Sequence, residues 1–470
     1  MSTYICNVCD DKNNFMLIRF KVENFRSFGN EVEFSCLATP ERGHRQRILT
    51  GPQPGLRLLT VAAIYGANAS GKSNLYRAVE FARKLVVSGV KLEAPIAVQP
   101  FRLDPARRSA PARFYFEVLV KDRVLGYRFA VDREKVVEES LTEFRPASKR
   151  LLFSRDAASG SEPKWDLDYF KSLDLKAEEL QFIEFVAKGT PKNQLFLREA
   201  HGRNVKHFEA LWRWFRHSLL LIDPQSTASG LEFQLQEQRL KDFSTQMLRG
   251  ADVGIDRLGT EMVSLESLDL PKELRQQLES DCKEGQSLLL RSSMGHRLNL
   301  RRENGELKVA KLVSYHRVEG GGDEVAFDIA EESDGTQRVV DLLPTFHELA
   351  NADEEFVVFV DEIDRSVHSK LTRGLIEGYL SCRPANARSQ LLFTTHDATL
   401  LDQALFRRDE VWMIDKNDQG ESELTSLGDF KLRGDKRLMK DYLLGRFGGV
   451  PRVQRLPLRL AATVAARVSP

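Results

Sequence analysis

Cysteine is scarce in this sequence, and its spacing excludes a zinc ribbon. Five cysteines occur in 470 residues, and only Cys6 and Cys9 lie close together, as a single CxxC pair. A zinc ribbon needs a second pair of ligands at a defined spacing, and the other cysteines are scattered. This pattern is typical of free thiols in a reducing compartment.

Excess charge of one sign and long apolar runs are also lacking. The 69 basic residues are balanced by 68 acidic ones, which argues against a polybasic coat for nucleic acid. No apolar run reaches the roughly 18–20 residues that cross a bilayer, and residues 1–15 are too polar for a signal peptide. We therefore expect a cytoplasmic protein with no membrane partner. Residues 1–15 are expected to be a leader or an alternative start before Met16.

The hydrophobic pattern predicts an α/β fold with two lobes. Residues 16–149 hold alternating strand patterns and the apolar run LLTVAAIYG, which precedes a glycine-rich loop. Residues 150–304 hold charged segments of helical period without sustained heptads, which predicts a helical insertion and no long coiled coil. Residues 305–450 alternate helix and strand patterns again. We expect a mixed sheet plus an antiparallel sheet, followed by a tail at 451–470.

A phosphate-binding loop (P-loop) is predicted at Gly66–Ser73, where GANASGKS satisfies the pattern GxxxxGK[ST]. The loop follows an apolar strand and opens a helix, as this motif requires. Its backbone amides can turn toward phosphate oxygens, Lys72 can bind the β- and γ-phosphates, and the Ser73 hydroxyl can ligate Mg²⁺. The residues predicted to bind ATP here are Gly66, Asn68, Ser70, Gly71, Lys72, Ser73 and Asn74.

A pair of carboxylates, Asp361 and Glu362, follows the apolar run FVVFV. At the end of a buried strand, Asp361 can hold Mg²⁺ and Glu362 can polarise the attacking water, so the pair predicts ATP hydrolysis. His396 ends another apolar run, LLFTT. It is either a structural histidine or, beside the nucleotide strand, a sensor of the γ-phosphate. The predicted catalytic residues are Lys72, Glu362 and His396.

A second motif with small polar groups at a helix N-terminus is ESDGTQR, which contains Ser333, Gly335 and Gln337. Together with the P-loop and the carboxylate pair, it resembles the ABC-type ATPases of the SMC and recombination-repair class. In that family the P-loop of one subunit faces the serine–glycine signature of another. The resemblance implies a head-to-tail dimer with two ATP molecules at the interface. Asp334 departs from the glycine that is more usual in the signature.

The same resemblance assigns three further residues. Asp364 stands at the position of the D-loop, which crosses the interface. Arg26, in VENFRSF, matches a basic position that approaches the nucleotide after the first strand. Gln99, in VQPF, matches the Q-loop glutamine that is linked to Mg²⁺, although an ordinary solvated loop is an equally good interpretation. The implied metal site therefore consists of Ser73, Asp361 and Gln99.

The sequences NFRSF, GANASGKSN and YLLGRFGGVP, with a short insertion between the lobes, resemble small AAA-type ABC ATPases of bacterial phage-defence loci, such as the AriA-like and RloA-like families. Such ATPases commonly act as oligomeric scaffolds that sense an invader and sequester, release or activate a separately encoded effector. The resemblance implies a toxin or Toprim-type nuclease as the effector. It implies a phage protein or DNA as the trigger.

Three other functions were weighed against defence. An SMC-like DNA repair or maintenance ATPase predicts long heptad arms, which residues 150–300 do not supply. A nuclease with its own Toprim domain needs well over a hundred further residues, and only about 75 follow His396. A metabolic P-loop kinase has no use for the signature or for the carboxylate pair. DNA maintenance is therefore the alternative function.

Overall fold

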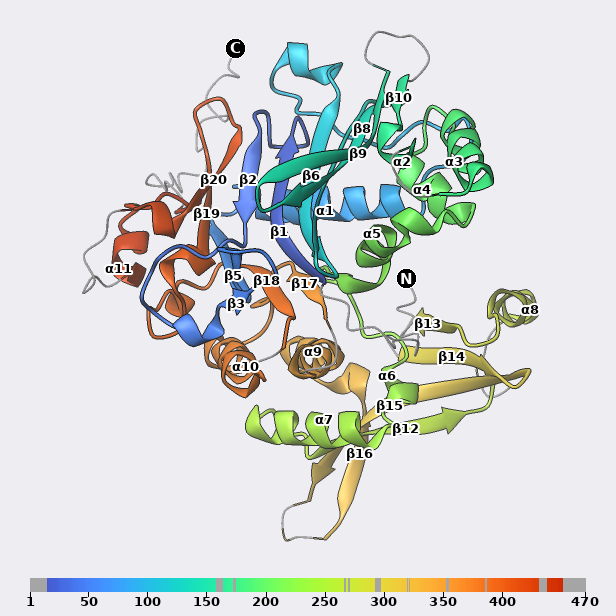
Figure 1. Cartoon of the computed structure of the whole chain (residues 1–470). Coiled ribbons are helices and arrows are strands. Elements are labelled where there is room, and N and C mark those ends of the chain that lie inside the picture. Colours follow the sequence, from blue (N-terminus) through green and yellow to red (C-terminus); the bar gives the residue numbers. More distant parts are fainter. Residues whose placement is uncertain are drawn as a thin grey trace, which may run out of the picture.

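The computed structural model arranges the described part of the chain in four sheets with helices packed around them (Figure 1). It describes residues 15–450 except for gaps at 158–163, 172–174, 266–267, 269–270, 292–296, 319, 321, 352–354, 385–386 and 431–437. The predicted leader up to residue 14 and the tail 451–470 lie outside the described residues. Phe15, which was assigned to the leader, is the first residue of β1.

An antiparallel sheet of seven strands, in the order β10-β9-β8-β7-β6-β1-β2, forms the first lobe. Along β6 and β8 most side chains alternate between buried and partly exposed, because one face of the sheet packs on the core and the other faces outward. The strands are β1 Phe15–Glu23, β2 Val32–Ser35, β6 Ala112–Val120, β7 Arg123–Val131, β8 Val136–Arg145, β9 Ser148–Asp156 and β10 Lys164–Asp166; a separate short pair is β3 Leu49–Thr50 and β4 Arg57–Leu58.

A sheet of six strands, in the order β11-β17-β18-β5-β19-β20, forms the centre of the molecule. All neighbours are parallel except β19 and β20, so five of the strands end at one common edge. The strands β5, β17 and β18 are buried along their whole length, since both faces of the sheet are covered. The strands are β5 Val61–Gly66, β11 Leu219–Ile222, β17 Val357–Val360, β18 Gln390–Thr395, β19 Val411–Lys416 and β20 Ser422–Ser426.

The two faces of this central sheet carry different helices. On one face, α1 (Lys72–Val87) packs between the six-stranded and seven-stranded sheets, through residues such as Leu75 and Val79. On the other face lie α9 (Asp334–Ala350) and α10 (Ser369–Cys382), which share a separate hydrophobic core with β5, β17 and β18. Figure 1 shows α1 above the sheet and α9 and α10 below it.

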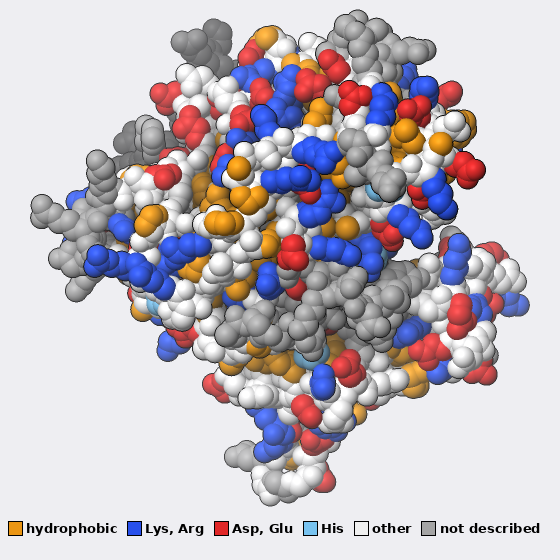
Figure 2. All heavy atoms as spheres, in the orientation of Figure 1, with side chains coloured by type: hydrophobic (Ala, Val, Ile, Leu, Met, Phe, Trp, Pro, Cys, Tyr) orange, Lys and Arg blue, Asp and Glu red, His pale blue; other side chains and the backbone are white. Residues whose placement is uncertain are grey.

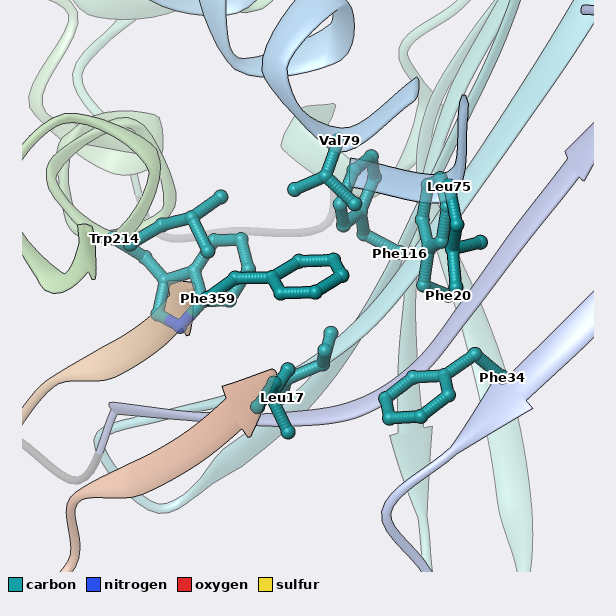
Figure 3. Close-up of a pocket in the computed structure, with 10 residues that line it drawn as sticks. Leu17, Phe20, Phe34, Leu75, Val79, Phe116, Trp214 and Phe359 are labelled. Atoms are coloured by element: carbon teal, nitrogen blue, oxygen red, sulfur yellow. The ribbon is translucent and has the colours of Figure 1, made fainter. Parts of the chain in front are cut away.

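A small cavity remains in the core between α1 and the two large sheets (Figure 3). Its lining is apolar and comes from both sheets, from α1 and from Trp214. The residues are Leu17, Phe20, Phe34, Leu75, Val79, Phe116, Trp214, Leu219, Phe359 and Leu392. Ligand sites usually add a few polar groups that fix the ligand's orientation, so we interpret this cavity as a packing gap.

The segment 150–304 is only partly helical, which corrects the prediction made from its periodicity. Its strand β11 joins the central sheet, and β12 Arg257–Val263, β13 Ser287–Arg291, β14 Arg297–Glu303, β15 Glu306–Arg317 and β16 Glu324–Asp328 form a further antiparallel sheet of five strands. Short apolar runs fit a helix as well as a strand, so periodicity alone could not separate them. The helices are α2 Asp168–Lys171, α3 Ala177–Lys188, α4 Phe196–Gly202, α5 Glu209–Arg213, α6 Leu231–Gln234, α7 Gln238–Gly250 and α8 Lys272–Asp281.

The predicted fold class is confirmed: the chain is an α/β protein with a mixed sheet and an antiparallel lobe, and its described residues contain no long coiled coil. The longest helix among the described residues, α9, has 17 residues. Basic and acidic side chains are interspersed over the face shown in Figure 2. Within the described residues, none of the helices has the length and apolar character that a membrane span requires.

Candidate nucleotide-binding site

The P-loop connects the end of β5 to the start of α1, at the edge where the parallel strands end. The Lys72 side chain is buried there. Its ammonium donates hydrogen bonds to the backbone oxygens of Gly66, at 2.6 Å, and Ala67, at 3.0 Å. A third contact, of 3.3 Å, joins Nζ of Lys72 to Nδ1 of His396. The positive charge therefore lies inside the loop, where a phosphate group would need it.

Burial lowers the pKa of Lys72 to about 8, and the carboxylates of Asp361, Glu362 and Asp364 offset only part of that effect. At neutral pH the lysine still carries its proton, but the charge is poorly solvated. Such a charge interacts strongly with an incoming anion because little water screens it. The site is therefore prepared for a phosphate.

Two positions of the loop require glycine for steric reasons. A Cβ on Gly66 would lie 2.5 Å from the backbone oxygen of Ile414 and 2.5 Å from Oγ of Ser70. Gly71 has a φ of 121°, which side chains rarely adopt, and a Cβ there would collide with Oγ of Ser422. The chain passes so close to β19 and β20 that only glycine fits at either position.

Three polar side chains support the P-loop from outside. Oγ of Ser422 donates to the backbone oxygen of Ser70 at 2.5 Å and lies 2.8 Å from Oγ of Ser27. Nδ2 of Asn74 donates to the same Ser27 hydroxyl at 2.8 Å. Asn74 thus helps to support the loop. Neither Ser27 nor Ser422 is predicted from the sequence. The only signal for Ser27 was its place beside Arg26 in NFRSF.

Thr394 connects the two carboxylate positions after β17. Its Oγ1 donates to Oδ1 of the buried Asp361 at 2.6 Å and accepts a hydrogen bond of 2.7 Å from the backbone N–H of Glu362. Glu362 has a φ of 50°, an uncommon conformation that surrounding contacts must hold in place. The end of β18 therefore fixes the backbone of the predicted general base.

His396 lies between the lysine and the predicted general base. Its backbone N–H donates to Oδ2 of Asp364 at 3.0 Å, and its Nε2 is 4.0 Å from Oε1 of Glu362. Burial, and then the charge of Lys72, lower the pKa of His396, so the ring is neutral at neutral pH. Because Nδ1 faces an ammonium it must accept, and the proton therefore resides on Nε2.

The predicted signature forms the N-terminus of α9. Ser333 is exposed, and its Oγ accepts a hydrogen bond of 3.2 Å from the backbone N–H of Thr336. A Cβ on Gly335 would collide with the backbone oxygen of Ser366, just after Asp364, so the signature packs on its own chain's D-loop. The Gln337 amide bonds to the Glu332 backbone oxygen at 2.8 Å and to Arg297 at 2.9 Å. The exposed groups available to a second molecule are therefore those around Ser333.

The structure brings Lys72, Glu362, Asp364 and His396 together at one edge of the central sheet. The signature helix α9 packs on the opposite face of that sheet from α1, which carries the P-loop lysine. The P-loop cluster beside α1 and Ser333 at the start of α9 are therefore associated with opposite faces of the sheet.

The remaining predicted residues lie around this edge. Arg26 has a φ of 52°, and its backbone N–H donates a hydrogen bond of 2.7 Å to the backbone oxygen of Gln99. Burial lowers the pKa of the Arg26 guanidinium, which faces Arg77 and Glu80 of α1. Gln99 is exposed in the coil after α1, and Asn68 is exposed at the tip of the P-loop. Their predicted roles stay predictions.

A further strand, β11, ends at the same edge and is not predicted from the sequence. β11 pairs in parallel with β17, and the backbone N–H of Asp361 donates to the oxygen of Ile222 at 2.8 Å. Asp223 and the exposed Gln225 follow directly. The sheet therefore places Asp223 beside Asp361, with Gln225 close by. The signal was present in LLLID, an apolar run that ends in an acidic residue as FVVFVD does.

The donor types at this edge suit Mg²⁺. The Ser73 hydroxyl, in the first turn of α1, and the Asp361 carboxylate are oxygen ligands, which Mg²⁺ prefers. Across the described ranges, no group of three His, Cys, Asp or Glu side chains is arranged to hold a metal ion by itself. Mg²⁺ commonly takes one or two protein ligands and completes its shell with phosphates and water, so this sparse set fits.

Comparison with known proteins identifies the family. Residues 61–402 match the family described as "AAA domain, putative AbiEii toxin, Type IV TA system". The chain belongs to this family. It is therefore an AAA-family ATPase, and the matched region covers the P-loop, the signature, the carboxylate pair and His396.

Two solved structures are similar to this AAA-family chain at low identity. One is the "SmcHead bound to the C-winged helix domain of ScpA", with a TM-score of 0.38 and 13% identity over 87% of this chain and 97% of that chain. The other is the SMC head domain from Thermotoga maritima, with a TM-score of 0.32 and 13% identity over 87% of this chain and 98% of that chain. None of the curated proteins matches the sequence.

Proposed function

We propose that this ATPase binds ATP with Mg²⁺ and hydrolyses it in composite sites between two copies arranged head to tail. The observation that carries the proposal is the placement of α1 and α9 on opposite faces of the central sheet. A second copy could bring its exposed Ser333 to the ATP held by Lys72 of the first. The N-terminus of α9 would then stabilise the γ-phosphate with its backbone amides and positive dipole end.

In this proposal each residue of the P-loop cluster has a distinct role. Lys72 contacts the β- and γ-phosphates, and Glu362 accepts a proton from the attacking water. His396 carries its proton on Nε2 and can donate it in a hydrogen bond to a γ-phosphate oxygen. Ser73 and Asp361 would hold Mg²⁺, which neutralises phosphate charge when bound.

Two polar residues are candidates for the amide linked to Mg²⁺. Gln99 was assigned from its sequence context, whereas Gln225 follows β11, the strand that pairs with the Asp361 strand. We favour Gln225 for this role because parallel strands deliver the residues after them to one edge. Arg26 and Asp364 would contact the nucleotide and the opposing subunit, respectively.

Mixing two inactive variants tests the composite site. Lys72→Ala removes the contact between the lysine and the phosphates. Ser333→Arg places a bulky cation where the signature would meet the ATP phosphates of the other copy. Each variant by itself should lose ATPase activity. A one-to-one mixture should recover about a quarter of the wild-type activity, because half of the dimers then contain one intact site.

The matched control mixes Lys72→Ala with Glu362→Gln. Both changes lie in the P-loop half-site, so every site in the mixed dimer keeps one defect and activity should stay absent. A Lys72→Ala and Ser333→Arg mixture that stays equally inactive would show that each chain works alone, and the head-to-tail arrangement would then be wrong.

The proposal extends to phage defence in the cytoplasm. The ATPase would act as an oligomeric scaffold and sensor that sequesters or activates a separately encoded toxin or Toprim-type nuclease, in response to a phage protein or DNA. It is supported by the resemblance to AriA-like and RloA-like ATPases and by a family description that includes a toxin system. An SMC-like DNA maintenance role is the alternative. It is less favoured because the longest helix in the described ranges, of 17 residues, is far too short for a coiled-coil arm.

A further inference from the structure

Residues 442–450, with the sequence YLLGRFGGV, form a turn that touches the P-loop. It begins in α11 (Leu438–Leu443), and two consecutive glycines, Gly448 and Gly449, have φ angles of 71° and 69°. A Cβ on Gly449 would lie 3.3 Å from Cα of Gly66, the first residue of the P-loop. Nearly all real Cβ contacts are longer, so only glycine fits without movement of the loop.

The turn also lies against β19, the strand next to the P-loop strand. A Cβ on Gly449 would lie 3.6 Å from the Ile414 oxygen, which is the oxygen that excludes a side chain on Gly66. A Cβ on Gly448 would lie 2.8 Å from Oδ2 of Asp415. The backbones of Gly66, Ile414 and Gly449 therefore pack closely against one another.

Side chains of α11 fix the turn in this position. The Tyr442 hydroxyl donates to the Gly449 oxygen at 3.0 Å. The Tyr442 ring packs edge-on against Tyr65, the residue before Gly66, with ring centroids 5.9 Å apart. Arg446 bonds to Asp441 at 2.7 Å. The turn is thus tied to the P-loop strand through Tyr65 and to the loop itself through Gly449.

We propose that Tyr442, Gly448 and Gly449 act as a C-terminal clamp that holds the P-loop backbone in its phosphate-binding shape. Gly66 is the critical contact, because its oxygen also accepts the hydrogen bond from Lys72. A shift of Gly66 would move both the lysine anchor and the start of the loop. Gly449 and Tyr442 are positioning residues, and their assignment rests on the proposed function of the P-loop as an ATP site.

Two glycine substitutions distinguish an effect of the clamp on ATP binding from the general effect of backbone strain on stability. Gly449→Ala and Gly445→Ala introduce the same methyl group at similar φ angles, 69° and 74°, but a Cβ on Gly445 meets no atom within 4 Å. Both variants should lose similar thermal stability without nucleotide. Only Gly449→Ala should weaken ATP binding, by about tenfold, since small displacements of binding groups carry large penalties.

A third variant, Tyr442→Phe, keeps the ring packing and removes the hydrogen bond to Gly449. It should raise the Kd for ATP by about threefold, which corresponds to a hydrogen bond of modest net strength. It also keeps the proposal testable if Gly449→Ala does not fold. In both clamp variants KM for ATP should rise more than kcat falls, because the clamp acts on nucleotide binding.

The outcomes distinguish the two levels of the proposal. Wild-type protein that binds no ATP would overturn the ATP site itself, and the clamp with it. If the wild-type protein binds ATP, and Gly449→Ala, Gly445→Ala and Tyr442→Phe all bind it with the wild-type Kd, the clamp is overturned. The ATP site would still stand. A selective loss in Gly449→Ala and Tyr442→Phe would support it.

Discussion

The ammonium of Lys72 already has three partners in its own chain, at Gly66, Ala67 and His396. All three are neutral acceptors, whereas ATP phosphates are anions that form stronger, charge-assisted hydrogen bonds. A bound nucleotide should therefore draw the lysine away from Nδ1 of His396. The histidine would at the same time gain a partner for Nε2, so both residues would respond to the same phosphate.

The lowered pKa of Lys72 predicts pH-dependent ATP binding. Only the protonated ammonium attracts phosphate, and the free protein loses that proton with a pKa of about 8. ATP affinity should therefore fall as the pH rises above 8. Phosphate contact raises the lysine pKa again, so binding near that pH should take up a proton from solution.

Titration calorimetry in two buffers of different ionisation enthalpy measures this proton uptake. Lys72→Ala, in which the titrating group is absent, is expected to lose ATP binding altogether. An ATP affinity that stays constant as the pH rises well beyond the Lys72 pKa, with no proton uptake, would contradict the assignment of Lys72 as the phosphate contact.

At the scale of elements, the ends of β17 and β18 are joined by one hydroxyl. Thr394 is fully buried, and its Oγ1 bonds both to Asp361 and to the backbone of Glu362. Neighbouring parallel strands place these groups at one edge, but the hydroxyl fixes their mutual position. The strand pair therefore both carries Asp361 and Glu362 and, through Thr394, fixes how they lie relative to each other.

Thr394→Val tests this connection with a side chain of similar shape. Losing both hydrogen bonds should lower the free energy of unfolding by about 1–3 kcal/mol, because the buried partners are left unsatisfied. ATP turnover should fall more than ATP affinity does, since Glu362 and Asp361 would, in the proposed function, act on water and metal rather than on the P-loop. Thr395→Val, one residue along the same strand, is the control. Equal turnover in both variants would contradict the role of the bridge.

At the scale of the whole molecule, one sheet separates two surfaces with complementary tasks. The P-loop cluster lies on the side of α1, and the signature begins α9 on the other side. In the proposed function a monomer would hold two incomplete sites, and two copies would complete both. Under that proposal ATP binding would join subunits, as a scaffold that assembles or releases an effector requires.

Phage plating tests the defence proposal on the whole system. Cells that carry the gene with its native neighbours should resist some phages, and Lys72→Ala should remove that protection because the subunits could no longer close on ATP. Gly445→Ala, which keeps the ATP site, should still protect. Equal plating of wild type and Lys72→Ala across a broad phage panel would contradict the defence role and favour DNA maintenance.

The sequence alone determined the local parts of the site. Apolar runs before Gly66, Asp361 and His396 indicated buried strands, and the structure has β5, β17 and β18 there. A P-loop is recognisable because its glycines, lysine and serine stand at a fixed spacing within one short segment, Gly66–Ser73. The fold class could be predicted for the same reason, since strand and helix periods are properties of short segments.

Only the tertiary structure decided how these parts meet. No local pattern places β11 beside β17, so the sequence does not predict Asp223 and Gln225 at this edge. The helical period predicted for 150–304 likewise does not reveal the strands there. The supports at Ser27 and Ser422 join residues almost 400 positions apart, with a sequence separation of 395. The close approach of Gly449 to Gly66 is likewise seen only in the folded chain. Such contacts depend on which surfaces the whole chain buries together. A short sequence pattern does not specify those long-range contacts, so they are seen only in the folded chain.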